Sequence, residues 1–313
     1  LTALYCMLCG MSGYQHLSSN YLQVLIIPLG IYWIGSMSSE VITYTDLCDC
    51  LHIYVWSVMV FSVVIFVDYV PSLTVWLASA VYIYGSKNSA AQLMAVASIL
   101  LLCTYNTNAK KHRVLIKYCS LGFLLAVVLL IRARAAFVGI LVSMIFYPIM
   151  IRRFRLRYIL LLMAFLIFAL SDQRVLQLLK NAFLLNRYAG QGLDAFSSGR
   201  LTFYGRALDR FLEFPLIGVG KYYVDNLYIN VLTELGIVGG VPILLLWFCR
   251  AIMNARMTQV GRESDIFMAL RCMTIFYLSE SLFEAYPPFG PGATTFIFWL
   301  LCGYVDGRKG LGL

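Results

Sequence analysis

The sequence predicts an all-α polytopic membrane protein, a bundle of about ten or eleven transmembrane helices. Hydrophobic residues make up 61% of the chain and charged residues only 12%, with a mean hydropathy of +0.81. Soluble domains carry about 25% charged residues. The apolar residues form blocks of about 17–25 residues, the length that a helix needs to cross a bilayer. The blocks lack the polar–apolar alternation of barrel strands, so helices are the expected way to satisfy the backbone in lipid.

Each predicted helix corresponds to one apolar block. The first block starts at Leu1, within apolar sequence, so we expect one or two further helices before it. Block 72–84 is short and is expected to tilt, to lie at the interface or to extend further. Together the blocks predict one integral membrane domain over residues 1–313. They cover residues 1–13, 21–36, 50–68, 72–84, 89–105, 114–131, 135–151, 157–170, 227–250, 265–283 and 288–305.

Lysine and arginine in the short connections set the expected orientation, because they favour the cytoplasmic side. Alternating the spans places four basic clusters on that side, which explains most of the net charge of +9 without a nucleic-acid partner. The connections 37–49, 85–88, 171–224 and 284–290 then face outward. The clusters are Lys110, Lys111, Arg113 and Lys117; Arg152, Arg153, Arg155 and Arg157; Arg250, Arg256 and Arg262; and Arg308 with Lys309.

Two basic features lie on the predicted outer side, where topology does not explain them. Arg132 and Arg134 occupy a tight turn between two predicted helices. The outer loop 171–224 carries seven basic and four acidic residues, a net charge of +3. Positive charge there requires an anionic partner. The loop residues are Arg174, Lys180, Arg187, Arg200, Arg206, Arg210 and Lys221 against Asp172, Asp194, Asp209 and Glu213.

Residues 201–214 of the outer loop have helical periodicity. Ser197 or Ser198 is the expected N-cap, and Pro215 ends the helix. We expect an amphipathic helix against the outer membrane–water boundary. Its apolar face is formed by Tyr204, Ala207, Leu208 and Phe211. Arg206 and Arg210 lie one turn apart on another face.

The outer arginines are candidate phosphate ligands, because a guanidinium matches phosphate oxygens with two parallel hydrogen bonds. Arg132 and Arg134 either bind a phosphate group or reach toward lipid headgroups. Arg200 stands where a helix N-terminus and a guanidinium make an anion site, unless it is an exposed, solvated charge. Arg206 and Arg210 are either further anion ligands or local partners of Asp209 and Glu213.

The candidate base lies where the chain re-enters apolar sequence. Asp225 either caps the following helix or acts as a general base. Glu280 and Glu284, one turn apart near the outer end of a later helix, are partners for the outer arginines or rival bases. Asn226 and Tyr228 are adjacent candidate substrate contacts, and Tyr222, Tyr223 and Tyr228 are candidates to stack on sugar faces.

Two further patterns bear on cofactors. Gly218-Val219-Gly220 has no preceding strand and no third glycine, so a tight turn is the expected role rather than a nucleotide site. No histidine has metal-site spacing with cysteine, and we predict that no metal or other cofactor is required.

These motifs resemble, in order and spacing, the O-antigen ligase/polymerase family of bacterial envelope enzymes, which includes WaaL-type ligases and Wzy-type polymerases. The detailed match covers about residues 132–240. It consists of Arg134-Ala135-Ala136, Ser198-Gly199-Arg200, the run from Phe214 to Gly220, and Asp225-Asn226 leading to Glu234-Leu235-Gly236.

The resemblance implies a glycosyltransferase on the outer face of the bacterial cytoplasmic (inner) membrane. Its donor and acceptor would be undecaprenyl-diphosphate-linked glycans, and membrane lipid and a chain-length regulator are further expected partners. Arg134 and Arg200 would stabilise the diphosphate leaving group. Asp225, or else Glu280 or Glu284, would take the proton from the acceptor hydroxyl.

Polymerase and ligase remain alternatives within this resemblance. Ligases of the family commonly carry a histidine where this chain has Asp225, which favours a polymerase that joins repeat units into O-antigen, capsule or exopolysaccharide. A ligase would instead transfer the glycan to lipid A core. A flippase for lipid-linked oligosaccharide is a different class, which would place its charges near the bilayer midplane in broken helices. A structural or receptor protein would tolerate alanine at Arg134 and Arg200.

Overall fold

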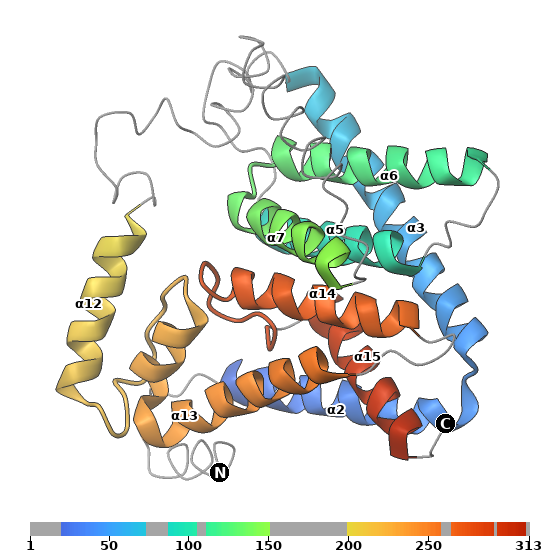
Figure 1. Ribbon diagram of the computed structural model, residues 1–313. Coiled ribbons are helices and arrows are strands. Elements are labelled where there is room, and N and C mark those ends of the chain that lie inside the picture. The colour runs from blue at the N-terminus through green and yellow to red at the C-terminus, as the bar shows by residue number, and fades with distance from the viewer. Residues whose placement is uncertain are drawn as a thin grey trace. The chain divides into compact units, whose positions relative to one another are not determined.

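The computed structural model describes residues 20–72, 87–104, 111–150, 199–257, 264–290 and 293–310. These residues form helices joined by turns, and no β-strand occurs among them (Figure 1). The chain divides into two compact units, one of residues 1–49 and 197–313 and one of residues 50–196. Each unit is described by itself. The predicted segments 1–13 and 157–170, and the basic cluster at 152–157, lie outside the described residues.

Four of the described helices are long and apolar enough to cross a membrane. They are α3 (Tyr44–Tyr69, extended by the 3₁₀ turn η1, Val70–Ser72), α5 (Lys87–Thr104), α6 (Lys111–Leu130) and α13 (Leu227–Arg256). Shorter apolar stretches lie in α2 (Asn20–Val41) and α7 (Arg134–Met150). The described part of the chain is therefore helical, as the composition predicted, and it contains four candidate membrane-spanning helices. The total of ten or eleven stays a prediction.

In the unit of residues 50–196, α5 is the most buried of the candidate spans. It packs against α6 and α7. The Tyr54 hydroxyl of α3 donates to the Leu93 carbonyl of α5 at 3.3 Å. Lys117 of α6 was counted with a cytoplasmic basic cluster, but its side chain is buried and Nζ donates to the Leu102 carbonyl at 2.8 Å. The small residues that permit close helix packing in α5 are Ala90, Ala91, Ala95 and Ala97.

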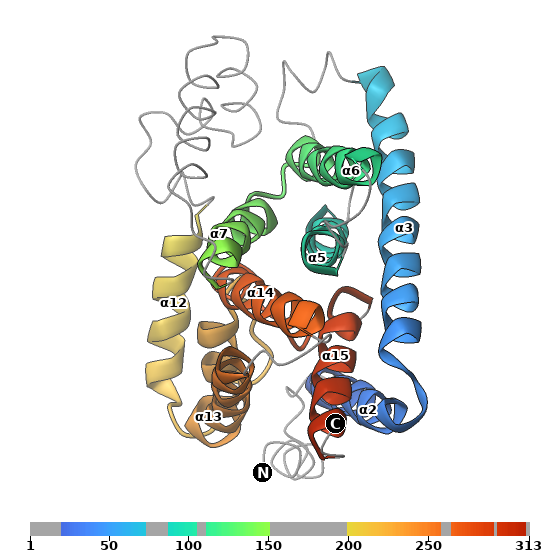
Figure 2. The same cartoon turned by 45° about the vertical axis from the view of Figure 1, so that its right-hand side comes forward.

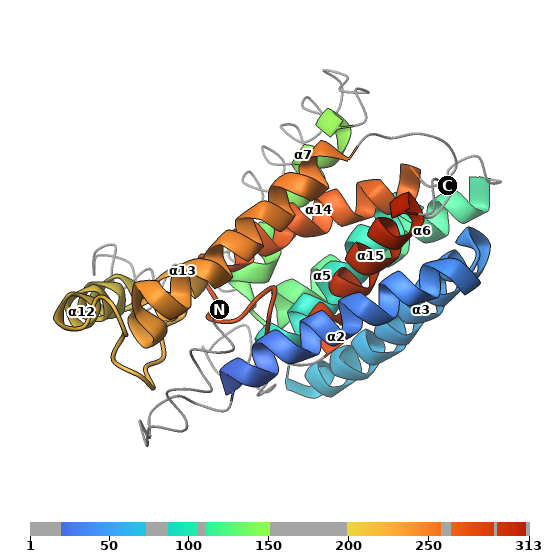
Figure 3. The same ribbon diagram turned by 90° about the horizontal axis from the view of Figure 1, so that it is seen from below.

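The other unit contains α2, α12 (Arg200–Glu213), α13, α14 (Ser264–Glu280) and α15 (Ala293–Gly310). Helix α15 packs along α2, and α14 contacts both α13 and α15 (Figure 2). Helix α12 packs against α13, and the two lie side by side in Figure 3. Aromatic rings fill the interior: Phe298 meets the rings of Trp247 and Tyr277 edge-on, with centroids 5.9 and 5.1 Å apart. This core fixes the helices that carry the site.

The predicted outer connection 37–49 is wrong, because α2 continues to Val41 and α3 begins at Tyr44. Ser38 and Ser39 do not end α2, since each hydroxyl donates to a carbonyl three residues earlier. The short connection is a reciprocal cap. The Asp46 amide donates to Thr43 Oγ1 at 3.3 Å, and the Thr43 amide donates to Asp46 Oδ2 at 3.2 Å.

The last two helices also differ from their predicted ends. Helix α14 ends at Glu280, so Glu284 lies beyond the helix in the turn that follows it. Helix α15 begins at Ala293 rather than at residue 288. Residues 284–290, which contain Pro287 and Pro288, are not helical, as predicted for a connection. The predicted helix start at residue 288 is wrong, because proline disfavours helical geometry in the residue before it.

Helix α13 is interrupted at Gly236, which divides it into a short first segment and a long second segment (Figure 1). Gly236 has φ 62° and ψ −167°, a conformation that essentially only glycine adopts. A Cβ at this position would also collide with the Leu216 carbonyl and the Gly218 amide of the preceding loop. The break therefore requires glycine for both its backbone angle and its close contact.

Candidate functional site

Helix α12 begins at Arg200 and packs on α13 through one narrow face. Gly199 is its N-cap residue, in the left-handed conformation (φ 80°), and makes no side-chain capping bond. The N-cap position is therefore Gly199 and not the expected Ser197 or Ser198, which lie outside the described residues. Ala207 is fully buried, and its carbonyl accepts from Thr233 Oγ1 of α13 at 3.2 Å. Leu208, expected on the same face, is 47% exposed. This packing places Arg200 next to the start of α13.

Asn226, not Asp225, caps α13. Its Oδ1 accepts from the Ile229 amide at 3.0 Å, and its Nδ2 donates to the Leu282 carbonyl at 3.1 Å. A side-chain oxygen that accepts an early helical amide is the standard N-cap contact. The amide of Asn226 is thus used within the protein. The carboxylate of Asp225 is not needed for capping and points to other partners.

Asp225 belongs to a group of three charged side chains that we call the Arg200 cluster: Arg200, Asp225 and Glu284. Arg200 Nη2 lies 3.2 Å from Asp225 Oδ2 and 3.7 Å from Glu284 Oε1. The side chains of Arg200 and Asp225 are 25% and 35% exposed, and that of Glu284 only 12%. The guanidinium also lies over the Phe283 ring, 6.0 Å from its centroid. The cluster combines an accessible carboxylate with a shielded one around a single cation.

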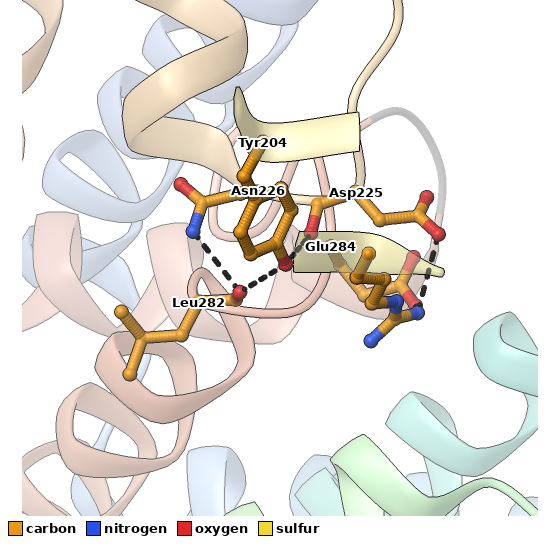
Figure 4. Close-up of polar contacts among 6 residues, drawn as sticks. Tyr204, Asp225, Asn226, Leu282 and Glu284 are labelled. Carbon is orange, nitrogen blue, oxygen red and sulfur yellow. Dashed lines mark hydrogen bonds and ion pairs between the residues drawn. The ribbon is translucent and has the colours of Figure 1, made fainter. Parts of the chain in front are cut away.

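Tyr204 joins α12 to the two backbone segments behind this cluster (Figure 4). Its hydroxyl lies 2.7 Å from the Asp225 carbonyl and 3.0 Å from the Leu282 carbonyl, and its one proton serves either acceptor. Burial raises the pKa of Tyr204 despite the opposing charge of Arg200. The hydroxyl therefore stays protonated at neutral pH. It holds together α12, the start of α13 and the turn after α14.

Two further tyrosines border the cluster. The rings of Tyr223 and Tyr286 are tilted at 47° to each other, with centroids 6.1 Å apart, and Tyr223 is 60% exposed. Burial of the hydroxyl raises the pKa of Tyr223, and the charge of Asp225 raises it further. Tyr223 is therefore a neutral donor beside a carboxylate, with an accessible aromatic face. Tyr228 instead stacks on Phe248, with centroids 5.7 Å apart.

The remaining predicted site residues differ in their surroundings. Arg210 Nη1 donates to Glu213 Oε2 at 2.9 Å, one of the two local partners expected for it. Arg206 lies over the Phe203 ring, 5.9 Å from its centroid. Glu280 ends α14 and is completely buried. Arg210 is thus paired with Glu213, and Glu280 is not accessible at the surface.

Arg132 and Arg134 belong to the unit of residues 50–196. They flank the predicted tight turn, which joins α6, ending at Leu130, to α7, beginning at Arg134. Arg132 is 2% exposed and has φ 57°, a left-handed conformation that residues other than glycine rarely adopt. Holding an arginine there costs about 1–3 kcal/mol. Such strain at a buried arginine is typical of a functional position.

Sequence reasoning assigned no role to three polar residues of this region. Asn230 and Glu234 of α13, the latter noted only as part of a motif, are buried and bind backbone amides of the loop before the helix. Tyr286 lies beyond α14, in the connection 284–290 that was predicted to follow that helix. The signal that could have found the first two is their spacing: an amide and a carboxylate one turn apart in an apolar helix need buried partners.

Neither a scan of protein-family models nor a search of curated proteins found a match to this chain. Within the described ranges, no group of three or more His, Cys, Asp or Glu side chains is placed to hold a metal ion. The chemical interpretation of the site therefore depends on its own residues and their geometry.

Proposed function

We propose that the chain is a membrane glycosyltransferase that polymerises undecaprenyl-diphosphate-linked oligosaccharide repeat units into a cell-envelope polysaccharide. The observation that carries the proposal is the Arg200 cluster. It holds an accessible carboxylate, Asp225, and a guanidinium within 3.2 Å, directly before an apolar helix of 30 residues. This is the pairing that sugar transfer from a lipid diphosphate needs: a base for the acceptor and a cation for the leaving group.

In the proposed reaction, the acceptor hydroxyl oxygen attacks the anomeric carbon of the donor sugar. The bond from that carbon to the diphosphate oxygen breaks, and the diphosphate leaves with the bonding electrons. Asp225 takes the hydroxyl proton, because it is the more exposed carboxylate of the cluster. Glu284, which is shielded, holds the guanidinium in position. Tyr223 and Tyr286 offer an aromatic surface for the acceptor sugar beside Asp225.

Charge balance requires further cations in this mechanism. Arg200 faces two carboxylates, so the cluster alone does not favour a diphosphate. The two ion-pair contacts involve Nη2 of the guanidinium, and a phosphate oxygen would bind at Nη1 or Nε. On the resemblance alone, Arg134 and Arg132 remain the predicted source of the additional charge, and Arg206 of α12 is a further candidate.

The membrane placement follows the same proposal. In this proposal the Arg200 cluster lies on the outer side of the bacterial cytoplasmic membrane, as the distribution of basic residues in the sequence predicts. Nucleotide sugars are absent on that side, so a lipid-linked donor is required. Besides the face that packs on α13, helix α12 has an exposed apolar stripe, with Leu201 49%, Leu208 47% and Leu212 71% exposed. Such a stripe suits an interfacial helix. It would keep Arg200 at headgroup level, where the diphosphate of a lipid donor lies.

The test is turnover by the purified protein in lipid vesicles, supplied with the lipid-linked repeat unit that accumulates in a strain lacking this protein. Longer glycan chains are expected. Asp225→Asn and Arg200→Ala should lower the rate by about 10²–10⁴-fold, the range for loss of a general base or of a charge-stabilising group. Glu40→Ala, an exposed carboxylate on α2, is the matched control. Full-length polymer from Arg200→Ala at normal protein level would remove Arg200 from the mechanism.

A flippase for the same lipid-linked substrate is the second candidate, and the break in α13 favours it. Broken helices with polar groups at the break are typical of transporters, and Glu234 and Asn230 lie within one and two turns of Gly236. In α13, however, the backbone groups at the break are bonded to a loop of the same chain. Sealed vesicles separate the candidates: a flippase moves the lipid without forming a glycosidic bond, and a polymerase forms the bond.

A further inference from the structure

The loop that carries Asp225 is docked into the break of α13. This α12–α13 loop comprises residues 214–226. On the first side of the break, the Thr233 and Glu234 carbonyls accept from the Val219 amide at 2.9 Å and the Gly220 amide at 3.2 Å. On the second side, the Ile237 and Val238 amides donate to the Pro215 and Leu216 carbonyls at 2.9 and 3.1 Å. The loop therefore replaces hydrogen bonds that the helix loses at Gly236.

Two buried side chains of α13 hold the next part of the loop. Glu234 Oε1 accepts from the Tyr222 amide at 2.9 Å, and Asn230 Oδ1 accepts from the Val224 amide at 2.8 Å. Asn230 Nδ2 donates to Glu234 Oε2 at 3.4 Å, which joins the two anchors. Asn230 is fully buried and Glu234 is 5% exposed. Burying a carboxylate costs free energy unless hydrogen bonds compensate for the lost water, and here the Tyr222 amide and the Asn230 side chain supply such bonds.

We propose that Glu234 and Asn230 are positioning residues that fix Tyr223 and Asp225 at the Arg200 cluster. The anchored amides, those of Tyr222 and Val224, flank Tyr223 and immediately precede Asp225. Asn226, which follows, is fixed by its own capping contacts. The Asp225 carboxylate is thus set on a backbone held on both sides, and its own bond to Arg200 does not have to hold the loop.

This inference rests on the proposed function only for its effect on catalysis. Placement of a catalytic group is worth about 10²-fold in rate for a displacement of about 1 Å. Without the side-chain anchors, the backbone between Gly220 and Asp225 would be held only at its two ends, by the bonds near Gly218 and Gly220 and by the Tyr204 hydroxyl at the Asp225 carbonyl. The side-chain anchors remove that freedom where the proposed base is attached.

Hydrogen exchange of the full-length protein, resolved to single amides, tests the anchoring without any substrate. In Glu234→Ala, the Tyr222 amide should exchange about tenfold faster, as expected for one lost hydrogen bond. The Val219 and Gly220 amides should keep their protection, because their acceptors are backbone carbonyls. Glu234→Gln retains an acceptor oxygen and should keep Tyr222 protected. If Glu234→Ala does not fold, Asn230→Ala tests the Val224 amide in the same way. Unchanged exchange at these amides overturns the inference.

Turnover in vesicles tests the link to catalysis. Glu234→Ala should lower kcat about 10- to 100-fold with little change in KM, since the loop and not the substrate is displaced. Glu234→Gln should restore kcat and leave the pH profile as in the wild type, with Glu40→Ala as control. Faster exchange at Tyr222 with unchanged kcat would show that the anchors do not position the base. A wild type without turnover would refute the proposed function, and hydrogen exchange would still decide whether Glu234 holds the loop.

Discussion

Two arginine clusters lie near opposite ends of α13, and they are built differently. In the Arg200 cluster, next to the start of the helix, one guanidinium nitrogen lies 3.2 Å from the accessible carboxylate of Asp225 and 3.7 Å from the shielded carboxylate of Glu284. In what we call the Arg250 cluster, Arg250 of α13 pairs with Asp306 of α15, and the Tyr32 hydroxyl of α2 donates to the same carboxylate at 2.9 Å. The side chain of Arg250 is only 7% exposed.

Because their burial differs, the two clusters are suited to different roles. In a buried ion pair, water cannot take the place of a lost partner. Removing one partner therefore leaves the other charge buried and uncompensated. A partly exposed pair exchanges its partners with water at little cost. The Arg250 cluster therefore joins three helices of its unit, whereas the Arg200 cluster can open to admit a charged ligand. Similar groups serve stability at one end of α13 and, as proposed, chemistry at the other.

The largest expected effect comes from removing the guanidinium of each cluster. Arg250→Ala should lower the free energy of unfolding by about 3–5 kcal/mol, because Asp306, only 18% exposed, is left without its counterion. Arg200→Ala should change it by less than about 1 kcal/mol. Reversible unfolding in mixed detergent micelles measures both. Replacing the pair together, as Arg250→Met with Asp306→Leu, should recover most of the loss. Equal losses for the two single variants would contradict the distinction between the clusters.

A smaller effect is expected from the glycine that lets the Arg250 cluster form. Gly303 brings α15 onto the α2 backbone, and a Cβ there would collide with the carbonyl of Tyr32, the residue that binds Asp306. Gly303→Ala should therefore push the helices apart and cost about 1–3 kcal/mol of unfolding free energy.

Gly30 on α2 is the matched control, since a Cβ there meets nothing within 4 Å. Gly30→Ala should be neutral or slightly stabilising, because alanine favours the helix. The same unfolding measurement applies to both variants. A loss at Gly30 as large as at Gly303 would show that helix propensity, and not close packing, explains the effect.

The sequence predicted the helices far better than the clusters. Apolar blocks are local, so the class and the approximate bounds of α5, α6, α7 and α13 follow from composition. Pairing is not local. Arg250 looked like one member of a cytoplasmic basic cluster, and its partner Asp306 lies 56 residues away in a different helix.

The candidate site shows the same limit. Asp225 and Asn226 were equally placed to cap α13, and the sequence left open whether Asp225 was a cap. The choice depends on a distant partner. The side-chain amide of Asn226 donates to the carbonyl of Leu282, which lies 56 residues later in the chain. Gly236 was noted as part of a motif, but nothing local indicates that a loop enters the helix there. Glu234 and Asn230 were missed because their partners are backbone amides, which no residue type reveals.

The smallest expected effect is at the far end of α12. Arg210 and Arg200 are ten residues apart on one helix, and both were predicted to contact substrate. Arg210 is fully exposed and paired with Glu213, which raises its pKa and keeps it charged. An exposed pair three residues apart contributes little to stability. Arg210→Ala should leave both the free energy of unfolding and the rate of glycan transfer unchanged, while Arg200→Ala lowers the rate of transfer by about 10²–10⁴-fold. Loss of transfer in Arg210→Ala would extend the anion site along the whole helix, and the contrast between exposed and enclosed arginines would no longer predict which residue acts.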